Sequence, residues 1–164
     1  MLREWVNVQS KCEESFTALH FASFFGNLTL AVYLIGVGAD PFSTNKCDIN
    51  MLHVAAQGDQ PRSLAFFLRQ GLDINSRDKR MSTPLHWAAF AGSEMALNYI
   101  LAWGGDFDAQ DVKGLTPLFL AIKASEEIRS TQSVRALLYK GASIKIRNSE
   151  GHLPISLLAD FDLS

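Results

Sequence analysis

Four histidines and two cysteines are the residues of this chain with the greatest capacity for catalysis or metal binding. His20, His53 and His86 are each 33 residues apart, so they occupy one place in a repeating unit. No histidine lies four residues from another and no Cys-x-x-Cys occurs, so the ligand spacing of common metal sites is missing. We therefore predict that these three imidazoles are structural and tie a helix start to the adjacent hairpin backbone.

The remaining reactive side chains also lack the partners that chemistry requires. A nucleophilic cysteine needs a base positioned by the fold, and the sequence singles out none for Cys12 or Cys47. We expect both to be partly exposed thiols in hairpins. His152 has no evident acidic or metal-binding partner. The glycines occur once per repeat and form no phosphate-binding loop, so we predict no catalytic residue, metal or cofactor in this segment.

The composition is that of a globular domain rather than a disordered chain. The chain has 164 residues, of which 48% are hydrophobic and 20% charged, with a net charge of −2. This balance provides no general basic face, so we expect no nucleic-acid binding. No apolar run is long enough for a membrane span and no secretory signal opens the chain. Two cysteines form no disulfide framework, which favours a reducing, cytoplasmic compartment, and we expect a monomer.

The chain repeats itself, and two independent landmarks fix the register. A four-residue motif recurs every 33 residues, at residues 17–20, 50–53, 83–86 and 116–119. Gly38, Gly71 and Gly104 are also 33 apart, whereas Gly141 follows 37 residues later. Both landmarks place a four-residue insertion in the fourth unit, near residues 125–129. We expect it between that unit's two helices, as a tolerated surface excursion.

Each unit has the pattern of two helices followed by a hairpin. A leucine of the motif precedes an alanine by three residues, as in Leu85 and Ala88, which places both on one helical face. The second helix carries its own apolar stripe and ends at the landmark glycine, where a left-handed residue is common. The sequence therefore predicts an all-α solenoid of four full repeats and a partial fifth. Its segments are 1–11 (a remnant of a preceding repeat), 12–44, 45–77, 78–110, 111–147 and 148–164.

The 33-residue period and the motif resemble the ankyrin repeat. The third unit carries Thr83-Pro84-Leu85-His86 followed by Ala88, which agrees with the family pattern T-P-L-H-x-A. The resemblance covers nearly the whole chain and implies a concave surface formed by first helices and hairpins. The hairpin glycine of the family is present in two units and replaced in three. The replacements are Ser15, Asp48 and Met81, so we expect those hairpins to be distorted or to carry partner contacts.

Both ends of the chain are incomplete as repeats. Residues 1–11 align with the hairpin return of a unit whose helices are missing, and Leu153–Ala159 supplies a first helix without a second. Solenoids normally carry polar terminal caps, yet Trp5 lies near one end and Leu158 near the other. We expect the natural protein to continue beyond at least one end, and the alternative is a degenerate cap.

The concave surface is the predicted site for a protein or linear peptide. The outer side of the first helices is unusually aromatic, and aromatic anchors with polar neighbours are typical of binding hot spots. Four of seven hairpin residues beside them are basic, which suits a ligand with acidic residues or a terminal carboxylate. For Trp87, partner contact and packing between repeats remain equally open. The predicted binding residues are Phe24, Phe25, Lys46, Ile49, Gln57, Lys79, Arg80, Ser82, Trp87 and Phe90.

Two stretches carry a narrower resemblance. Residues 52–61 (LHVAAQGDQP) and 83–89 (TPLHWAA) resemble the N-terminal ankyrin domains of Asp-His-His-Cys protein palmitoyltransferases. Those membrane enzymes recruit substrates through extended Gln-Pro peptides, and the resemblance implies that Trp87 lies in the peptide groove. It also implies the cytosolic face of an endomembrane. The Asp-His-His-Cys signature is absent from these residues, so acyl transfer would belong to another part of the protein. The alternative is a stand-alone scaffold or an inhibitor of a folded partner.

Overall fold

A computed structural model describes residues 6–8 and 15–156 of the chain. Three features singled out above lie outside these residues: Trp5, Cys12 and residues 157–159 of the helix expected at Leu153–Ala159. Most of the segment 1–11 lies outside them as well. Within it, the Asn7 side chain donates to the Gly38 carbonyl at 3.0 Å and accepts from the Asp40 amide at 3.2 Å.

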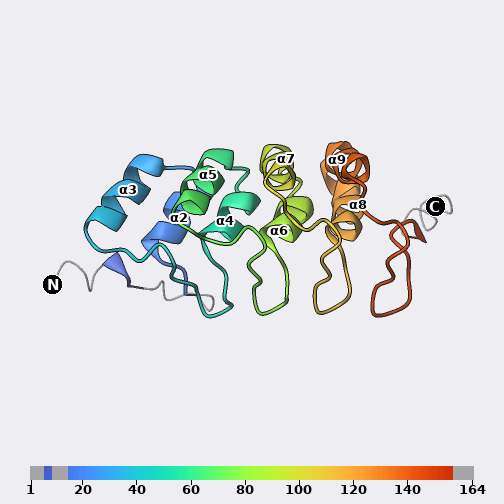
Figure 1. Ribbon diagram of the computed structural model, residues 1–164, viewed down its shortest axis with the longest axis horizontal. Coiled ribbons are helices and arrows are strands. Elements are labelled where there is room, and N and C mark those ends of the chain that lie inside the picture. The colour runs from blue at the N-terminus through green and yellow to red at the C-terminus, as the bar shows by residue number, and fades with distance from the viewer. Residues whose placement is uncertain (1–5, 9–14, 157–164) are drawn as a thin grey trace.

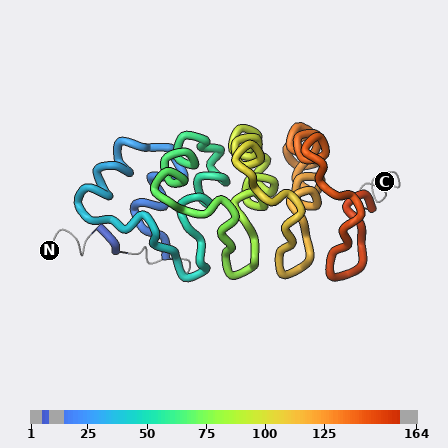
Figure 2. Tube along the Cα trace, viewed as in Figure 1, coloured from blue at the N-terminus to red at the C-terminus, as the bar shows by residue number. Residues whose placement is uncertain are grey.

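Four pairs of helices stand side by side along the molecule (Figure 1). Each first helix packs on the first helix of the next pair and on its own second helix. Long loops connect successive pairs and project to the same side (Figure 2). The described residues contain helices and no strand, which confirms the predicted all-α solenoid. The first helices are α2 (Ala18–Phe24), α4 (Met51–Gln57), α6 (Pro84–Ala91) and α8 (Pro117–Ile128), and the second helices are α3 (Leu28–Gly36), α5 (Pro61–Arg69), α7 (Glu94–Ala102) and α9 (Gln132–Lys140).

The first helices form the continuous core that holds the stack together. In α6 and α8 a proline occupies the first turn, where no amide partner is lost. The motif leucine and the alanine three residues later are at most 2% exposed in all four first helices. The small alanine allows the neighbouring helix to approach closely, and the leucine fills the space between repeats. These buried residues are Leu19, Ala22, Leu52, Ala55, Leu85, Ala88, Leu118 and Ala121.

The landmark glycines end the second helices as the spacing predicts. Gly38, Gly71, Gly104 and Gly141 have φ values of 108°, 104°, 85° and 96°, all in the left-handed region. Glycine adopts this region without the clash that a Cβ introduces. The chain therefore reverses after each second helix and enters the loop that leads to the next hairpin. None of the helices in the described part of the chain combines the length and the apolar character needed to cross a bilayer.

Four hairpins of the described part of the chain are each closed by an Asn or Asp side chain. In the hairpin of Asp78, the carboxylate Oδ1 accepts from the amides of Arg80 at 2.8 Å and Ser82 at 2.9 Å. The same two bonds recur in three further hairpins, at the equivalent position of each. Such side-chain turns fix the hairpin without a regular strand. The residues that accept these bonds are Asn45, Asp78, Asp111 and Asn148.

The residues that replace the hairpin glycine keep its left-handed backbone conformation. Ser15, Asp48 and Met81 have φ values of 58°, 58° and 61°, close to the 70° of Gly114 and 84° of Gly151. The distortion expected for the hairpins of Asp48 and Met81 is therefore wrong. In both, an Asn or Asp side chain accepts the amides of the residues before and after the left-handed one. Adjacent hairpins are also linked, because the amide at one tip donates to a carbonyl of the preceding tip, as Lys79 does to Cys47 and Val112 to Arg80, both at 2.9 Å.

The three periodic histidines connect each repeat to the next hairpin, as predicted. His86 Nδ1 accepts a hydrogen bond from the Thr83 amide at 3.1 Å, and His86 Nε2 donates one to the Leu115 carbonyl at 3.1 Å. His20 and His53 make the equivalent bonds. In the fourth repeat, buried Phe119 takes the place of histidine. The Thr116 hydroxyl there has no hydrogen-bond partner among the described residues.

The insertion in the fourth repeat does not lie between the helices. It adds one turn to α8, which runs through Ile128 and ends at left-handed Arg129 with φ 53°. The expected loop excursion is therefore wrong. The extra turn returns toward the preceding repeat, where the Ser130 hydroxyl donates to the Glu94 carboxylate at 2.6 Å.

Candidate functional site

Trp87 is held at the concave surface by a carboxylate that also closes the hairpin. It lies on the first turn of α6, where its partly buried ring packs against the core. Its indole Nε1 donates to Asp78 Oδ2 at 3.0 Å, while Asp78 Oδ1 accepts the hairpin amides. The ring also contacts His53 edge to face, with centroids 6.0 Å apart. Trp87 therefore packs against the core with part of its ring and exposes the rest. The bond to Asp78 and the contact with His53 orient the ring.

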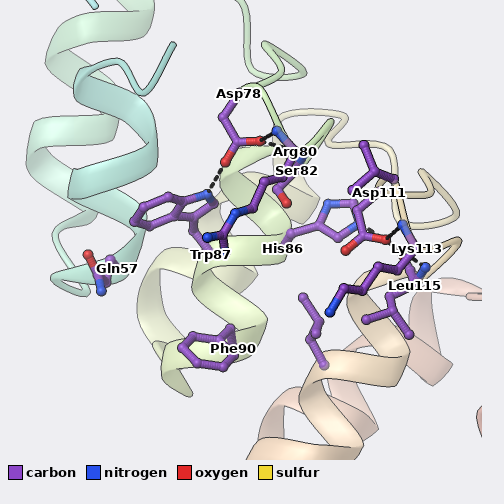
Figure 3. A pocket seen from close by; sticks show the side chains of 12 residues that line it. Gln57, Asp78, Arg80, Ser82, His86, Trp87, Phe90, Asp111, Lys113 and Leu115 are labelled. Carbon is purple, nitrogen blue, oxygen red and sulfur yellow. Dashed lines mark hydrogen bonds between the residues drawn. The ribbon is translucent and has the colours of Figure 1, made fainter. Parts of the chain in front are cut away.

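A cleft of about 600 Å³ opens beside this ring, between two hairpins and the helices behind them (Figure 3). We call it the Trp87 cleft. Figure 3 shows Trp87 and Phe90 on one helix, with Gln57 on the helix before it. Phe90 is 62% exposed, although it is a large apolar side chain. The lining residues are Gln57, Asp78, Arg80, Ser82, His86, Trp87, Phe90, Asp111, Val112, Lys113, Leu115 and Leu120.

Four charged side chains line the Trp87 cleft: two carboxylates that accept hydrogen bonds within the protein and two exposed cations. Asp78 is buried and already accepts three hydrogen bonds, and Asp111 Oδ1 accepts the amides of Lys113 and Leu115, both at 2.8 Å. The side chains of Arg80 and Lys113 are exposed and make no ion pair within the described residues. The two exposed cations are therefore free of direct ion pairs beside an apolar centre, while both carboxylates are bound to neutral N–H groups.

Half of the ten predicted binding residues line this cleft: Gln57, Arg80, Ser82, Trp87 and Phe90. Four others lie on the surface away from it. Phe25, Lys46 and Lys79 are exposed, and Phe24 is half-buried against Phe25 with ring centroids 5.0 Å apart.

The prediction that the Ile49 side chain contacts a partner is wrong. Its side chain is only 3% exposed, and its carbonyl accepts the Nε2 proton of His20 at 3.0 Å. Ile49 is therefore a core residue of the junction between the first two repeats, and it offers no side-chain surface to a partner.

Sequence reasoning missed Asp78, Asp111 and Val112 as cleft residues. The two aspartates follow the same 33-residue spacing as the histidines. They also precede the first helix by a constant number of residues, so their turn-forming role was accessible from the repeat alone. The bond from Asp78 to Trp87 was not accessible, since tryptophan occurs at that place in only one repeat.

Comparison with known families now bears on this geometry. The family model described as ankyrin repeats (3 copies) matches residues 52–148, and the model for a single ankyrin repeat matches residues 14–46. The chain belongs to the ankyrin-repeat family. No curated protein matches the chain. Ankyrin repeats bind proteins, which indicates that the chain is a protein–protein interaction module.

Burial favours the neutral form of the three repeated histidines, of which His86 lines the Trp87 cleft. Burial lowers the pKa of His53 from 6.5 to about 4, and it lowers the pKa of His20 and His86 in the same direction. Hydrogen bonds from these rings to backbone carbonyls oppose that shift without cancelling it.

Among residues 6–8 and 15–156 no three side chains form a group that could hold a metal ion. What the Trp87 cleft offers a ligand is apolar contact, hydrogen bonding and the exposed cations of Arg80 and Lys113.

Proposed function

We propose that this ankyrin domain is a non-catalytic recruitment module that binds a linear peptide segment of another protein in the Trp87 cleft. The observation that carries the proposal is the immobilised indole of Trp87 beside the exposed ring of Phe90. An aromatic anchor already fixed by Asp78 loses little conformational entropy when a ligand packs on it. Clefts lined by aromatic side chains with a few polar groups are typical ligand sites.

A display experiment tests this proposal although the partner is unidentified. Random ten-residue peptides on phage are selected against the immobilised chain, and synthetic copies of the enriched peptides are titrated by fluorescence anisotropy. Trp87→Ala should weaken their binding about tenfold or more, as expected for truncation of a hot spot. Trp103→Ala is the matched control, because Trp103 is 53% exposed and stacks on Tyr99 at the end of α7.

The outcomes separate clearly. Enriched peptides that bind wild type and Trp103→Ala equally and lose affinity for Trp87→Ala support the cleft. Equal binding to all three proteins would overturn it. Circular dichroism melting of each variant identifies a loss that comes from unfolding.

We further propose that the parent protein is a membrane-bound protein-cysteine S-palmitoyltransferase acting at the cytosolic face of an endomembrane. The support is the resemblance of residues 52–61 and 83–89, together with the position of Gln57 and Trp87 in one cleft. Enrichment of Gln-Pro among the selected peptides is expected. The full-length coding sequence should also contain an Asp-His-His-Cys motif in a cysteine-rich segment beside membrane spans, and its absence would end this proposal.

The second candidate is a stand-alone scaffold or inhibitor of a folded partner. It is favoured by the exposed basic tips of the hairpins at Lys79 and Arg80. It predicts that Lys79→Ala weakens partner binding more than Trp87→Ala does. Pull-down of the partner with each variant distinguishes the two candidates.

A further inference from the structure

The concave surface continues past the Trp87 cleft into a second hollow of about 230 Å³. We call it the Lys123 hollow. It lies one repeat further along, between the fourth and fifth hairpins, and shares Lys113, Leu115 and Leu120 with the Trp87 cleft. The two hollows therefore form one path for an extended ligand. Its lining residues are Lys113, Leu115, Phe119, Leu120, Lys123, Asn148, Ser149, Glu150 and His152.

The chemistry changes along this path. The Trp87 cleft presents two aromatic rings, whereas the Lys123 hollow presents the exposed amines of Lys113 and Lys123. Lys123 occupies the place that Phe90 has one repeat earlier. A ligand that follows the path thus meets an apolar surface first and a cationic one after it.

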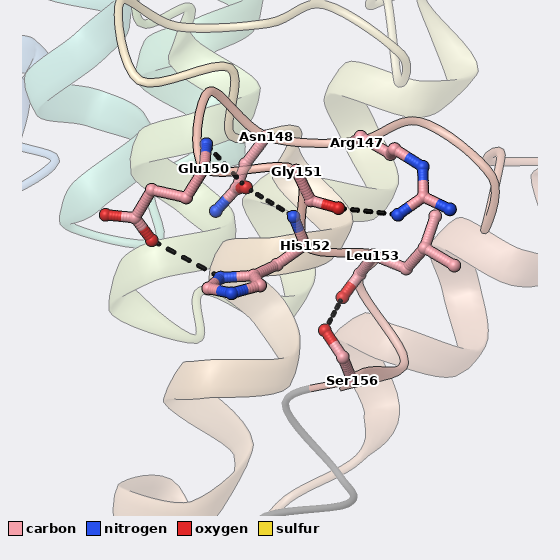
Figure 4. Close-up of polar contacts among 7 residues, drawn as sticks. All are labelled: Arg147, Asn148, Glu150, Gly151, His152, Leu153 and Ser156. Atoms are coloured by element: carbon pink, nitrogen blue, oxygen red, sulfur yellow. Dashed lines mark hydrogen bonds and ion pairs between the residues drawn. The ribbon is translucent and has the colours of Figure 1, made fainter.

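No acidic side chain of the described residues forms an ion pair with these amines. Glu150 pairs with His152 at 3.3 Å within its own hairpin (Figure 4). The Asn148 side chain closes the same hairpin by accepting the amides of Glu150 at 3.0 Å and His152 at 2.9 Å. Neither lysine forms an ion pair with any described residue. Two exposed cations that line one hollow without an ion-pair partner among the described residues favour a ligand carboxylate.

We infer that the peptide proposed above carries an apolar anchor and, three residues away, an aspartate or glutamate. The spacing follows from the repeat. Packed helices of neighbouring repeats lie about 8–10 Å apart, and an extended chain advances about 3.3 Å per residue. The anchor packs on Trp87 and Phe90, and the carboxylate lies between Lys113 and Lys123. This inference rests on the proposed function and adds the sequence pattern that the partner must have.

The selected peptides and one charge reversal test the inference. Wild-type selection should enrich an apolar residue and an acidic residue separated by two others. The double variant Lys113→Glu, Lys123→Glu should weaken binding of these peptides about tenfold, since two favourable exposed ion pairs become repulsive. It should also bind better when the acidic residue of the peptide is replaced by lysine. The matched control is Lys140→Glu, Lys145→Glu, which makes the same charge change at exposed positions outside both hollows.

Failure of the inference differs from failure of the proposed function. Peptides that depend on Trp87 but show no acidic preference, or that lose equal affinity in both double variants, overturn the three-residue pattern and leave the recruitment module intact. Peptides that bind independently of Trp87 overturn the proposed function and the pattern with it. Thermal melts of the double variants show that both are folded before affinities are compared.

Discussion

At the scale of single residues, Met81 has a backbone conformation that its side chain disfavours. Its φ is 61°, in a hairpin position where the fourth and fifth repeats carry glycine. A left-handed residue with a Cβ costs about 1–2 kcal/mol, and the greater entropy of unfolded glycine offsets about 0.5–1 kcal/mol of the gain. Met81→Gly should therefore raise the free energy of unfolding by roughly 0.5–1 kcal/mol. Urea denaturation followed by circular dichroism measures it.

Asp48→Gly provides the control for this prediction. Asp48 has nearly the same φ of 58°, but aspartate tolerates the left-handed region better than methionine does. The gain from Asp48→Gly should be the smaller of the two. A destabilised Met81→Gly protein would contradict the argument and would show that the partly exposed Met81 side chain contributes packing that exceeds its backbone strain.

Individual residues also show how far the repeat could be interpreted from the sequence. The bonding role of His53 was predictable, since a side chain that recurs at a structural period serves the repeat itself. The burial of Ile49 was not, because hairpin residues at its position are half-buried in the next two repeats, as Ser82 and Leu115 are. The orientation of Trp87 depends on Asp78, nine residues away, and periodicity does not report such a bond.

At the scale of elements, the ends of α2 and α4 approach so closely that only glycine fits between them. A Cβ on Gly58 would collide with the carbonyl oxygen of Phe24, which is backbone and cannot rotate away. Overpacking of this kind costs about 1–3 kcal/mol. Gly58→Ala should therefore lower the free energy of unfolding by about 2 kcal/mol or more, measured by urea denaturation.

Gly36→Ala is the matched control for Gly58→Ala. Gly36 is the last residue of α3, is exposed, and has open space where a Cβ would be placed. Alanine is favoured over glycine in a helix by up to about 1 kcal/mol, so this change should leave stability unchanged or raise it. Equal losses from both substitutions would show that α2 and α4 can move apart at little cost.

The fourth repeat shows what spacing predicts about an element and what it does not. Two landmarks located the four-residue insertion correctly in the chain. They did not predict its conformation, because four extra residues lengthen the spacing between landmarks equally whether they form a loop or a helical turn. The added residues include Glu126 and Ile128, which are compatible with a helix, and Ile128 reaches Gly92 of the preceding repeat. Contact with a neighbouring repeat decided the conformation.

At the scale of the whole molecule, His20, His53 and His86 form a series of bonds that crosses every junction from the first repeat to the fourth. Each ring is neutral, donates from Nε2 to the next hairpin and accepts at Nδ1 from its own helix start. Protonation at Nδ1 removes an acceptor and places a charge in a buried site. Because a solenoid is stabilised by its junctions, these rings make the stability of the stack depend on pH.

The sign of that dependence follows from the lowered pKa values. Between pH 6.5 and about 4 the unfolded chain binds a proton at His53 that the folded chain does not, so the free energy of unfolding falls as the pH falls through this interval. The shift at His53 corresponds to roughly 3 kcal/mol, and His20 and His86 act in the same direction.

Urea denaturation at several pH values should show that the free energy of unfolding declines less steeply with falling pH for His53→Gln than for wild type. His152→Gln, at an exposed position, should decline as wild type does, and parallel curves for wild type and His53→Gln would contradict the assignment.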